Sequence, residues 1–425
     1  MNKGLFKQEH AEGSKFYYGY VIVFLSFLVL FASMGIRGTF GTFVTPWETT
    51  FGASRLTVSF VSFTSLVIFG ISIVAAGRLS DRWGPRKVLS LGLFILGICM
   101  AASFFAKTIW HLAILYGVLA SVGFGFTSNV TVSVAIVRWF KQKQGLMISI
   151  IVLGMAGGPT LFAPMNIYLI DWIGWRWMFV IYGAIYALIL TPLYFFLYKD
   201  RPAAAPAAEP PVQERAKKSA KTTGVRPASI LRQPVTWMLV IPYVICGFTD
   251  IGLIQTHLVP LGEDRHFSNT TMADVMLVYG VLNIIGTVGV GYLTDLMSSK
   301  KILFMLYSLR VVGLLILSFT NDSVWLFIFA AMYGLTDIAT IAPFTMLCSK
   351  IYGVERMGSA FGFISFFHQF GAAAGSLVPG ILFGISHNYA STLWLSTGLL
   401  VFNSIMILSV NESRTTKAAV SVNSA

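Results

Sequence analysis

The chain has 425 residues, of which 56% are hydrophobic and only 11% are charged, and its formal net charge is +13. A soluble domain carries about 25% charged residues, so this composition requires an apolar solvent rather than a larger core. The three cysteines, Cys99, Cys246 and Cys348, lie far apart within apolar segments, which excludes a disulfide framework or a cysteine metal cluster.

Twelve apolar stretches follow one another along the chain. Each is close to or longer than the roughly 20 residues that a bilayer-spanning helix needs. They lie near residues 17–45, 55–77, 88–106, 109–138, 144–170, 175–198, 234–258, 270–294, 301–319, 323–350, 356–384 and 388–410. The sequence therefore predicts an all-α integral membrane protein with twelve transmembrane helices.

The basic residues are unevenly distributed between the connecting segments. If the N-terminus is cytoplasmic, most of the 30 Lys and Arg residues fall in inner segments. The outer loops hold only Arg55, Lys107, Arg176 and Arg265, and the helices hold Arg37 and Arg310. This positive-inside bias predicts that both termini are cytoplasmic. The excess of basic residues is therefore explained by the orientation of the chain in the membrane and by contact with anionic lipid. It does not indicate nucleic-acid binding.

Residues 199–232 divide the chain into two parts. The segment is rich in Ala, Pro and Lys and has too few apolar residues to fold alone, so it is interpreted as a flexible cytoplasmic linker. We expect an N-terminal half at 1–198 and a C-terminal half with a short cytoplasmic tail at 233–425. Features of the first half recur in the second at similar spacing, which indicates an internal repeat with the substrate between two six-helix halves.

The second apolar stretch ends in a basic segment, Gly77–Lys87, which reads G-x-L-x-D-R-x-G-x-R-K. A shorter copy, Gly291–Asp295, occupies the same place in the second half. Asp81 is expected to cap the helix that follows the turn at Gly84. The pattern resembles the loop between the second and third helices of the major facilitator superfamily, where the loop is thought to latch the cytoplasmic side. The resemblance implies a gating group of Gly77, Asp81, Arg82, Gly84, Arg86 and Asp295.

Charged residues within the predicted helices are the main candidates for function. An ionised side chain at mid-bilayer costs roughly 2.5–3.5 kcal/mol on insertion scales, so such residues usually face a cavity or a partner. Arg37 would suit a substrate carboxylate through bidentate hydrogen bonds. Asp250 and Asp337 are the candidates for proton coupling. A static Arg37–Asp250 pair or an Arg310–Asp337 pair is the structural alternative.

Further polar residues complete the candidate site. The proposed substrate-binding residues are Arg37, Asn129, Asn283, His368 and Arg310. In the superfamily, helices 1, 4, 7 and 10 usually line the cavity, which implies a central position for Arg37, Asp250 and Asp337. Two small-residue patterns, Gly154 with Gly158 and Gly371 with Gly375, are interpreted as helix-packing sites.

Within the superfamily, the chain resembles the bacterial monocarboxylate-porter and oxalate/formate-antiporter branch. The resemblance rests on Tyr18–Val23 and Phe40–Phe43 in helix 1, Arg138-Trp139-Phe140 after helix 4, and His368–Gly371 in helix 11. Characterised members carry an arginine in helix 8, and the oxalate/formate type adds a lysine in helix 11. This chain has neither, so no residue is transferred from that anion site, and Arg37 is the candidate replacement.

The leading hypothesis is a monomeric secondary transporter of a small, monocarboxylate-like organic anion in the plasma membrane, coupled to protons. An exporter of hydrophobic drugs or metabolites is the alternative. A membrane sensor or receptor without transport is the alternative from another class. The scattered His and Cys residues give no enzyme-like constellation. No Walker-type phosphate loop appears, so neither a nucleotide nor another cofactor or metal is expected.

Overall fold

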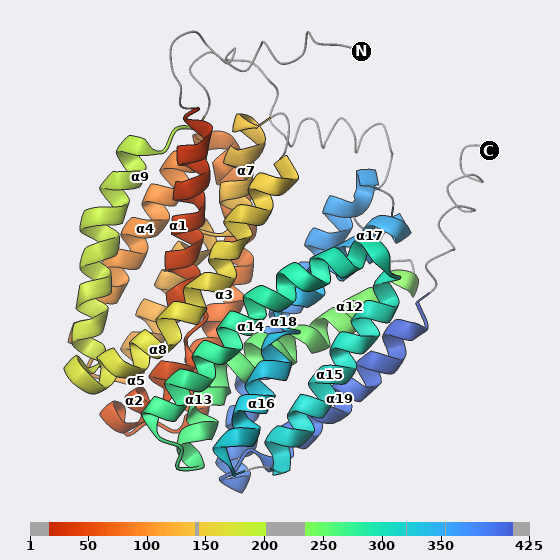
Figure 1. Ribbon diagram of the computed structural model, residues 1–425. Coiled ribbons are helices and arrows are strands. Elements are labelled where there is room, and N and C mark those ends of the chain that lie inside the picture. Colours follow the sequence, from red (N-terminus) through yellow and green to blue (C-terminus); the bar gives the residue numbers. More distant parts are fainter. Residues whose placement is uncertain (1–16, 141–143, 201–233, 320, 353, 411–425) are drawn as a thin grey trace, which may run out of the picture.

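The computed structural model describes residues 17–140, 144–200, 234–319, 321–352 and 354–410. All regular elements within these ranges are helical (Figure 1). The predicted linker at 199–232 lies outside the described residues except for its first two positions, and its predicted boundaries stay a prediction.

The helices of the N-terminal part are α1 (Gly19–Arg37), α2 (Gly41–Phe51), α3 (Arg55–Trp83), α4 (Pro85–Ala102), α5 (Ile109–Leu112), α6 (Ser121–Phe126), α7 (Asn129–Trp139), α8 (Gln144–Ala184) and α9 (Thr191–Leu197). Those of the C-terminal part are α12 (Pro234–Gly247), α13 (Gln255–Asp264), α14 (Asn269–Leu296), α15 (Ser299–Phe319), α16 (Ser323–Gly334), α17 (Ile341–Tyr352), α18 (Val354–Ser386) and α19 (Ala390–Leu408). Short π-helical segments join some of them, namely η3 (Ala113–Ala120), η4 (Ile185–Leu190) and η5 (Phe248–Ile254).

Eleven stretches of the described chain are long and apolar enough to cross a membrane. One of them, Ile150–Leu197, contains two of the twelve predicted helices. Gly174 breaks this stretch with a φ of 75°, a left-handed conformation that glycine adopts without strain. The prediction of an all-helical, twelve-helix membrane fold is confirmed.

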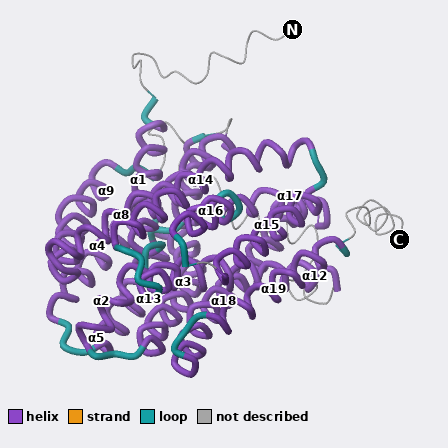
Figure 2. Tube along the Cα trace, turned by 60° about the horizontal axis from the view of Figure 1, so that its bottom comes forward, coloured by secondary structure: helices purple, strands orange, loops and turns teal. Residues whose placement is uncertain are grey.

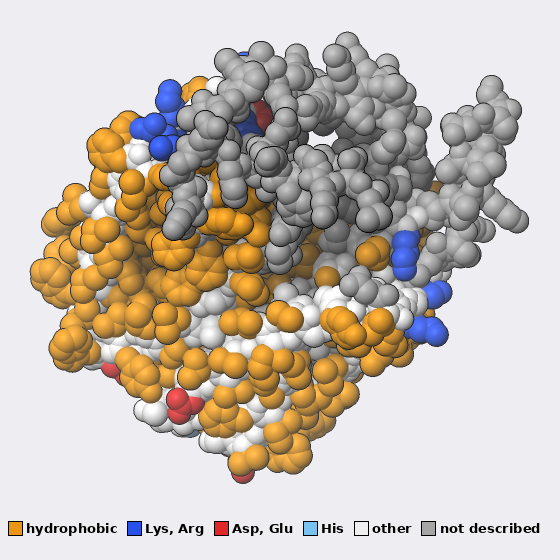
Figure 3. All heavy atoms as spheres, turned by 45° about the horizontal axis from the view of Figure 1, so that its top comes forward, with side chains coloured by type: hydrophobic (Ala, Val, Ile, Leu, Met, Phe, Trp, Pro, Cys, Tyr) orange, Lys and Arg blue, Asp and Glu red, His pale blue; other side chains and the backbone are white. Residues whose placement is uncertain are grey.

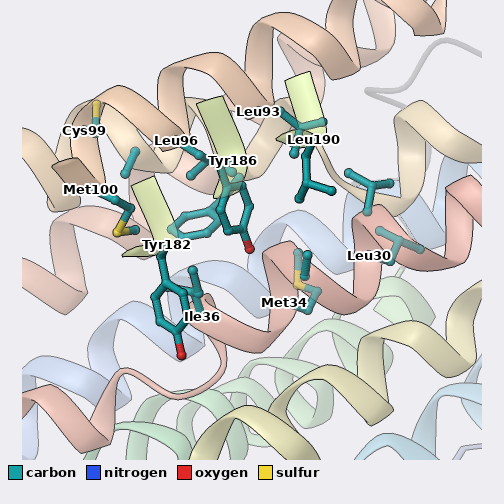
Figure 4. Packing of buried hydrophobic residues seen from close by; sticks show 14 of the residues in the cluster. Leu30, Met34, Ile36, Leu93, Leu96, Cys99, Met100, Tyr182, Tyr186 and Leu190 are labelled. Carbon is teal, nitrogen blue, oxygen red and sulfur yellow. The ribbon is translucent and has the colours of Figure 1, made fainter. Parts of the chain in front are cut away.

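The helices form two groups, α1–α9 and α12–α19, which lie side by side (Figures 1 and 2). Each group has its own buried apolar core. In the first core, the rings of Tyr182 and Tyr186 reach from the α8–η4 region toward Met34 of α1 and Leu96 of α4 (Figure 4). The groups meet mainly through α3 against α18 and α8 against α14.

The two ends of the helix groups differ. We call the end where α1 begins and α19 ends the terminal end, and the end that carries α2 and α13 the opposite end (Figure 1). Large apolar side chains such as Phe24, Leu188 and Val288 are more than 60% exposed, each within a candidate membrane span. Lys and Arg side chains gather near the terminal end (Figure 3). An apolar belt with polar ends is the surface that a bilayer requires.

The two small-residue patterns do pack helices, and they do so equivalently in both halves. A Cβ at Gly154 would lie 2.6 Å from the carbonyl oxygen of Phe27, and one at Gly158 would collide with the carbonyl of Phe31. In the second half, a Cβ at Gly371 or Gly375 would collide with carbonyls of α12 and η5. These glycines therefore let α8 approach α1 and let α18 approach η5 at backbone distance.

The expected cap by Asp81 is wrong. Asp81 lies in the last turns of α3, and the carboxylate before α4 comes from Asp200. Asp200 Oδ1 accepts from the backbone N–H of Arg86 at 2.8 Å. A Cβ at Gly84, whose φ is 87°, would lie 2.6 Å from the Asp200 carboxyl carbon. The loop glycine is therefore required both by its conformation and by the approach of Asp200.

Candidate functional site: a central cavity between the halves

A cavity of about 1020 Å³ lies between the two helix groups. Its walls come from α1 and α8 on one side and from α12, η5, α14, α18 and the start of α17 on the other. Most of the lining is apolar, with Met34, Val152, Met155, Pro159, Met276 and Ile341 among the contributors. A mostly apolar lining with a few polar groups is typical of a small-molecule site.

Arg37, the last residue of α1, is the only arginine or lysine among the described residues that line this cavity. Its guanidinium carbon lies 3.6 Å above the ring of Phe69. Nη1 has only the sulfur of Met34, 3.9 Å away, whereas Nε and Nη2 are buried and have no hydrogen-bond partner among the described residues. A buried donor without a partner costs about 1–3 kcal/mol, and this guanidinium has the capacity to donate to a further acceptor.

Arg310 of α15 has the opposite character, because every nitrogen of its guanidinium is engaged. Nη1 pairs with Asp250 Oδ1 at 2.6 Å, and Nη2 donates to the carbonyls of Thr336 and Asp337 at 2.5 and 2.8 Å. Nε donates to the hydroxyl of Thr336 at 3.1 Å. The side chain is fully buried and does not line the cavity. Neither of the two pairs considered from the sequence forms; the ion pair is Arg310 with Asp250.

Asp337 lines the cavity and is held by neutral donors. The hydroxyl of Tyr279 and the amide of Asn283 both donate to its Oδ2, at 2.6 and 2.9 Å. The Oδ1 of Asn283 in turn accepts from the backbone N–H of Ile338 at 3.1 Å. Asp337 is 4% exposed, and no ion pair to its carboxylate is found among the described residues. It is thus a buried carboxyl that faces a cavity without a cationic partner.

Of the other predicted substrate-binding residues, His368 lies in the cavity and Asn129 lies outside it. His368 lines the cavity and packs against the ring of Tyr243, with ring centroids 4.5 Å apart. Asn129 begins α7, accepts from the Ser133 hydroxyl and lies outside this cavity. Cavity residues that the sequence did not indicate include Tyr243, Tyr279, Gln255 and Thr160. Of these, only Tyr279 could have been predicted from the sequence, because it lies one helical turn before Asn283 and therefore on the same helix face.

The gating group predicted from the resemblance lies at the terminal end. Gly77, Asp81 and Arg82 belong to the last part of α3, and Asp295 lies in the last turn of α14. The guanidinium of Arg86 lies over the ring of Phe195 of α9, at 4.8 Å. In this structure, the described contacts of Gly84 and Arg86 are therefore to the end of the N-terminal half itself.

A network at the opposite end joins the two halves around Arg55. Its guanidinium pairs with Glu48 at 2.5 Å and with Asp264 of the other half at 2.8 Å. Nη1 also donates to the hydroxyl of Tyr389 at 2.9 Å. Burial raises the pKa of Tyr389 above its usual range, which keeps the phenol neutral. The Tyr389 oxygen lies 2.9 Å from Nδ1 of His257, a buried histidine whose Nε2 lies 2.8 Å from the carbonyl of Ser376.

Helix packing also closes the opposite end. A Cβ at Gly41 of α2 would lie 2.9 Å from the carbonyl oxygen of Gln255, and α2 contacts α13 across the halves. The network and this contact lie on the same side of the central cavity. The described contacts thus join the halves firmly at the opposite end.

Comparison with known proteins places the chain in a family. The family model of the Major Facilitator Superfamily matches residues 25–376 and 244–423. An uncharacterised MFS-type transporter of Bacillus subtilis is 27% identical over 379 residues, which cover 87% of this chain and 89% of that protein. Monocarboxylate transporter 13 of Rattus norvegicus is 22% identical over 406 residues, which cover 92% and 89%.

Two solved structures share the fold. A D-xylose–proton symporter superimposes with a TM-score of 0.75 at 16% identity, over 94% of this chain and 99% of that one. A bacterial homologue of the human lysosomal transporter Spinster, inward-facing and occupied, gives a TM-score of 0.75 at 14% identity, over 95% and 98%. The family model spans most of the chain and the helical architecture agrees with it, so this protein belongs to the Major Facilitator Superfamily of transporters.

Proposed function

We propose that the protein is a secondary transporter that carries a small organic anion with a carboxylate, coupled to protons, by alternating access. The observation that carries this proposal is the guanidinium of Arg37, which lines the cavity with two buried, unpartnered nitrogens. A carboxylate would satisfy both through a bidentate, charge-assisted pair. The mostly apolar lining fits a substrate whose remainder is an apolar body.

Coupling follows from the charges around the cavity. Arg310 neutralises Asp250, so Arg37 and Asp337 are the charges that respond to a ligand. An anion that binds to Arg37 while Asp337 is ionised leaves an uncompensated negative charge in a low-dielectric site. Protonation of Asp337 removes that charge and favours anion binding, and by linkage the bound anion favours protonation. In this proposal Asp337 carries the proton, and Asp250 is the fixed counter-charge of Arg310.

The proposed transport cycle also involves residues other than Arg37 and Asp337. Asn283 and His368 contact the substrate from the C-terminal half, while Asn129 and Arg310 act away from it. Both termini face the cytoplasm of a cell whose plasma membrane holds the monomer, since basic side chains gather at the terminal end (Figure 3). The gating group then latches the cytoplasmic side when the halves rock to the alternate state.

The second candidate is proton antiport of a hydrophobic compound. The apolar lining and the unpaired carboxyl of Asp337 favour it, because a cationic hydrophobic substrate would compensate that carboxylate. The unpartnered Arg37 in the same cavity opposes it. A cation would bind beside a like charge at a cost in binding free energy.

Uptake by proteoliposomes tests the proposal. Labelled acetate, lactate, pyruvate and benzoate are offered with and without an inward proton gradient. We expect the gradient to stimulate uptake of at least one probe, and we expect Arg37→Gln to weaken its apparent affinity roughly 10- to 150-fold, or about 1.5–3 kcal/mol. Arg176→Gln is the matched control, because Arg176 donates to a backbone carbonyl outside the cavity. Uptake of none of the probes, or equal uptake by both variants, would refute the carboxylate site.

A further inference from the structure

A second, smaller cavity adjoins the first. Both are lined by Arg37, Ile251 and Gln255, so Arg37 stands at the boundary between them. The smaller cavity continues from Arg37 toward the opposite end, because Phe40, which follows α1, and Ser62 of α3 also line it. It therefore lies between the central cavity and the Arg55 network.

Tyr116 of η3 is the distinctive polar group of this smaller cavity. The residue is 1% exposed, and its hydroxyl has no hydrogen-bond partner among the described residues. The same is true of Nε and Nη2 of Arg37 in the same lining. Buried polar groups are almost always paired, so three unpaired donors around one small space point to an acceptor that is bound only part of the time.

The surroundings of Tyr116 fix the position of its hydroxyl. The ring lies in an aromatic cage, with centroids 5.6 Å from Phe40, 5.6 Å from Trp47 and 5.9 Å from Phe124. Aromatic packing of this kind restricts the ring, so the hydroxyl cannot turn away to another partner. The residue also lies in a π-helical segment, a feature often found at functional sites.

The neighbouring hydroxyls are already engaged with each other. Ser121 donates to Ser65 at 2.7 Å, and the hydroxyls of Ser62 and Thr256 lie 3.5 Å apart across the two halves. Among the buried side-chain atoms of this lining, the unpartnered donors therefore belong to Tyr116 and Arg37. A carboxylate has two oxygens that together accept several hydrogen bonds, and it matches the positive charge of the guanidinium.

We propose that the smaller cavity is a carboxylate subsite, in which Tyr116 donates to one oxygen of the substrate carboxylate that Arg37 holds, while the rest of the substrate stays in the central cavity. This inference rests on the proposed anion site at Arg37. It makes Tyr116 a recognition residue for the charged end of the substrate. The subsite also places that charged end beside the part of the structure that must open at the opposite end.

The test removes one oxygen atom and keeps the ring. Tyr116→Phe is compared with Tyr186→Phe, because Tyr186 is also buried with an unpartnered hydroxyl but lines neither cavity. Both tyrosines belong to the packed core of the N-terminal half, in which Tyr186 is shown in Figure 4, so the cavity is what distinguishes them. The probes are lactate, pyruvate and the neutral analogue lactamide, and the readouts are KM for uptake, competition by lactamide, and the shift in unfolding temperature that each probe causes.

We expect Tyr116→Phe to raise KM for the carboxylate probe about 10-fold or more, as for a lost hydrogen bond to a charged group, and to reduce the probe-induced thermal shift. Inhibition by lactamide should weaken by a smaller factor, because a hydrogen bond to a neutral carbonyl contributes less than one to a carboxylate. Tyr186→Phe should behave as wild type. An unchanged KM in Tyr116→Phe, or equal effects in both tyrosine variants, would overturn the subsite. If Arg37→Gln impairs uptake but Tyr116→Phe does not, the role of Tyr116 is refuted while the anion site at Arg37 stands. If wild type carries no carboxylate, both the Tyr116 subsite and the anion site at Arg37 are refuted.

Discussion

At the scale of single residues, the two arginines within membrane helices have different environments, and this difference is the basis of the separate roles proposed for them. Arg310 has a carboxylate, a hydroxyl and two carbonyls as partners, whereas Arg37 has two nitrogens with none among the described residues. The sequence predicted that both lie in the membrane, because their flanking residues are apolar. It did not predict which one pairs with Asp250, since that depends on how helices far apart in the chain pack together.

The two buried aspartates provide the first residue-scale prediction. Asp337→Asn keeps an oxygen that accepts from Tyr279 and Asn283, so we expect a folded protein. It should exchange labelled for unlabelled carboxylate across the membrane but should no longer respond to a proton gradient. The measurement is counterflow and gradient-driven uptake in the same vesicles. Retained stimulation by the gradient would rule out Asp337 as the proton site.

Asp250→Asn is the matched contrast to this substitution. It leaves the buried guanidinium of Arg310 without its counter-charge, a change that typically costs about 3–5 kcal/mol. We therefore expect a marked fall in unfolding temperature in detergent, in contrast to Asp337→Asn. Equal stability of the two variants would argue against the separate roles given to these carboxyls.

At the scale of helices, close packing depends on glycines at fixed spacing. The sequence predicted this correctly, because small residues four apart lie on one face of a helix whatever the partner is. It failed at Gly84, where a carboxylate distant in the chain, Asp200, approaches the loop and takes the capping role expected of Asp81. Local patterns are predictable from spacing, while a cap supplied from another helix is not.

A pair of adjacent glycines in α8 tests the packing. A Cβ at Gly158 would collide with the carbonyl of Phe31, whereas one at Gly157 would meet the Phe31 ring at an ordinary 3.6 Å. We expect Gly158→Ala to destabilise the protein by about 1–3 kcal/mol, as overpacking does, and Gly157→Ala to have little effect. Thermal unfolding of the purified variants measures this. Similar unfolding temperatures for both would show that α1 and α8 do not depend on this approach.

At the scale of the whole molecule, two helix groups enclose a cavity and are joined at the opposite end by the Arg55 network and by α2 against α13. Hydropathy and the internal repeat were sufficient to predict the groups. They did not indicate the network. Its members Asp264 and Tyr389 are far from Arg55 in the sequence, so the sequence alone predicted Arg55 only as a residue of an outer loop. In the proposed alternating-access cycle, this network breaks when the opposite end opens.

Arg55→Gln should therefore shift the protein toward states that are open at the opposite end, by about 1.5–3 kcal/mol for the lost charged hydrogen bonds. Spin labels on Thr49→Cys and Thr270→Cys, which are exposed at that end of each half, report the distance between the halves. The native cysteines are buried, which limits background labelling. We expect longer distances in Arg55→Gln than in Arg176→Gln. Identical distance distributions would mean that the network does not hold this end closed.

Coupled movement of a proton and an organic anion past Arg37 is tested most directly by measuring both fluxes at once. Proteoliposomes containing a pH-sensitive dye receive an inward gradient of the carboxylate that wild type carries, at equal pH on both sides. We predict that the interior acidifies as the labelled anion enters, beyond the passive signal of Arg37→Gln vesicles. Anion entry without acidification above that signal, or movement of hydrophobic cations instead of the anion, would contradict proton-coupled anion transport.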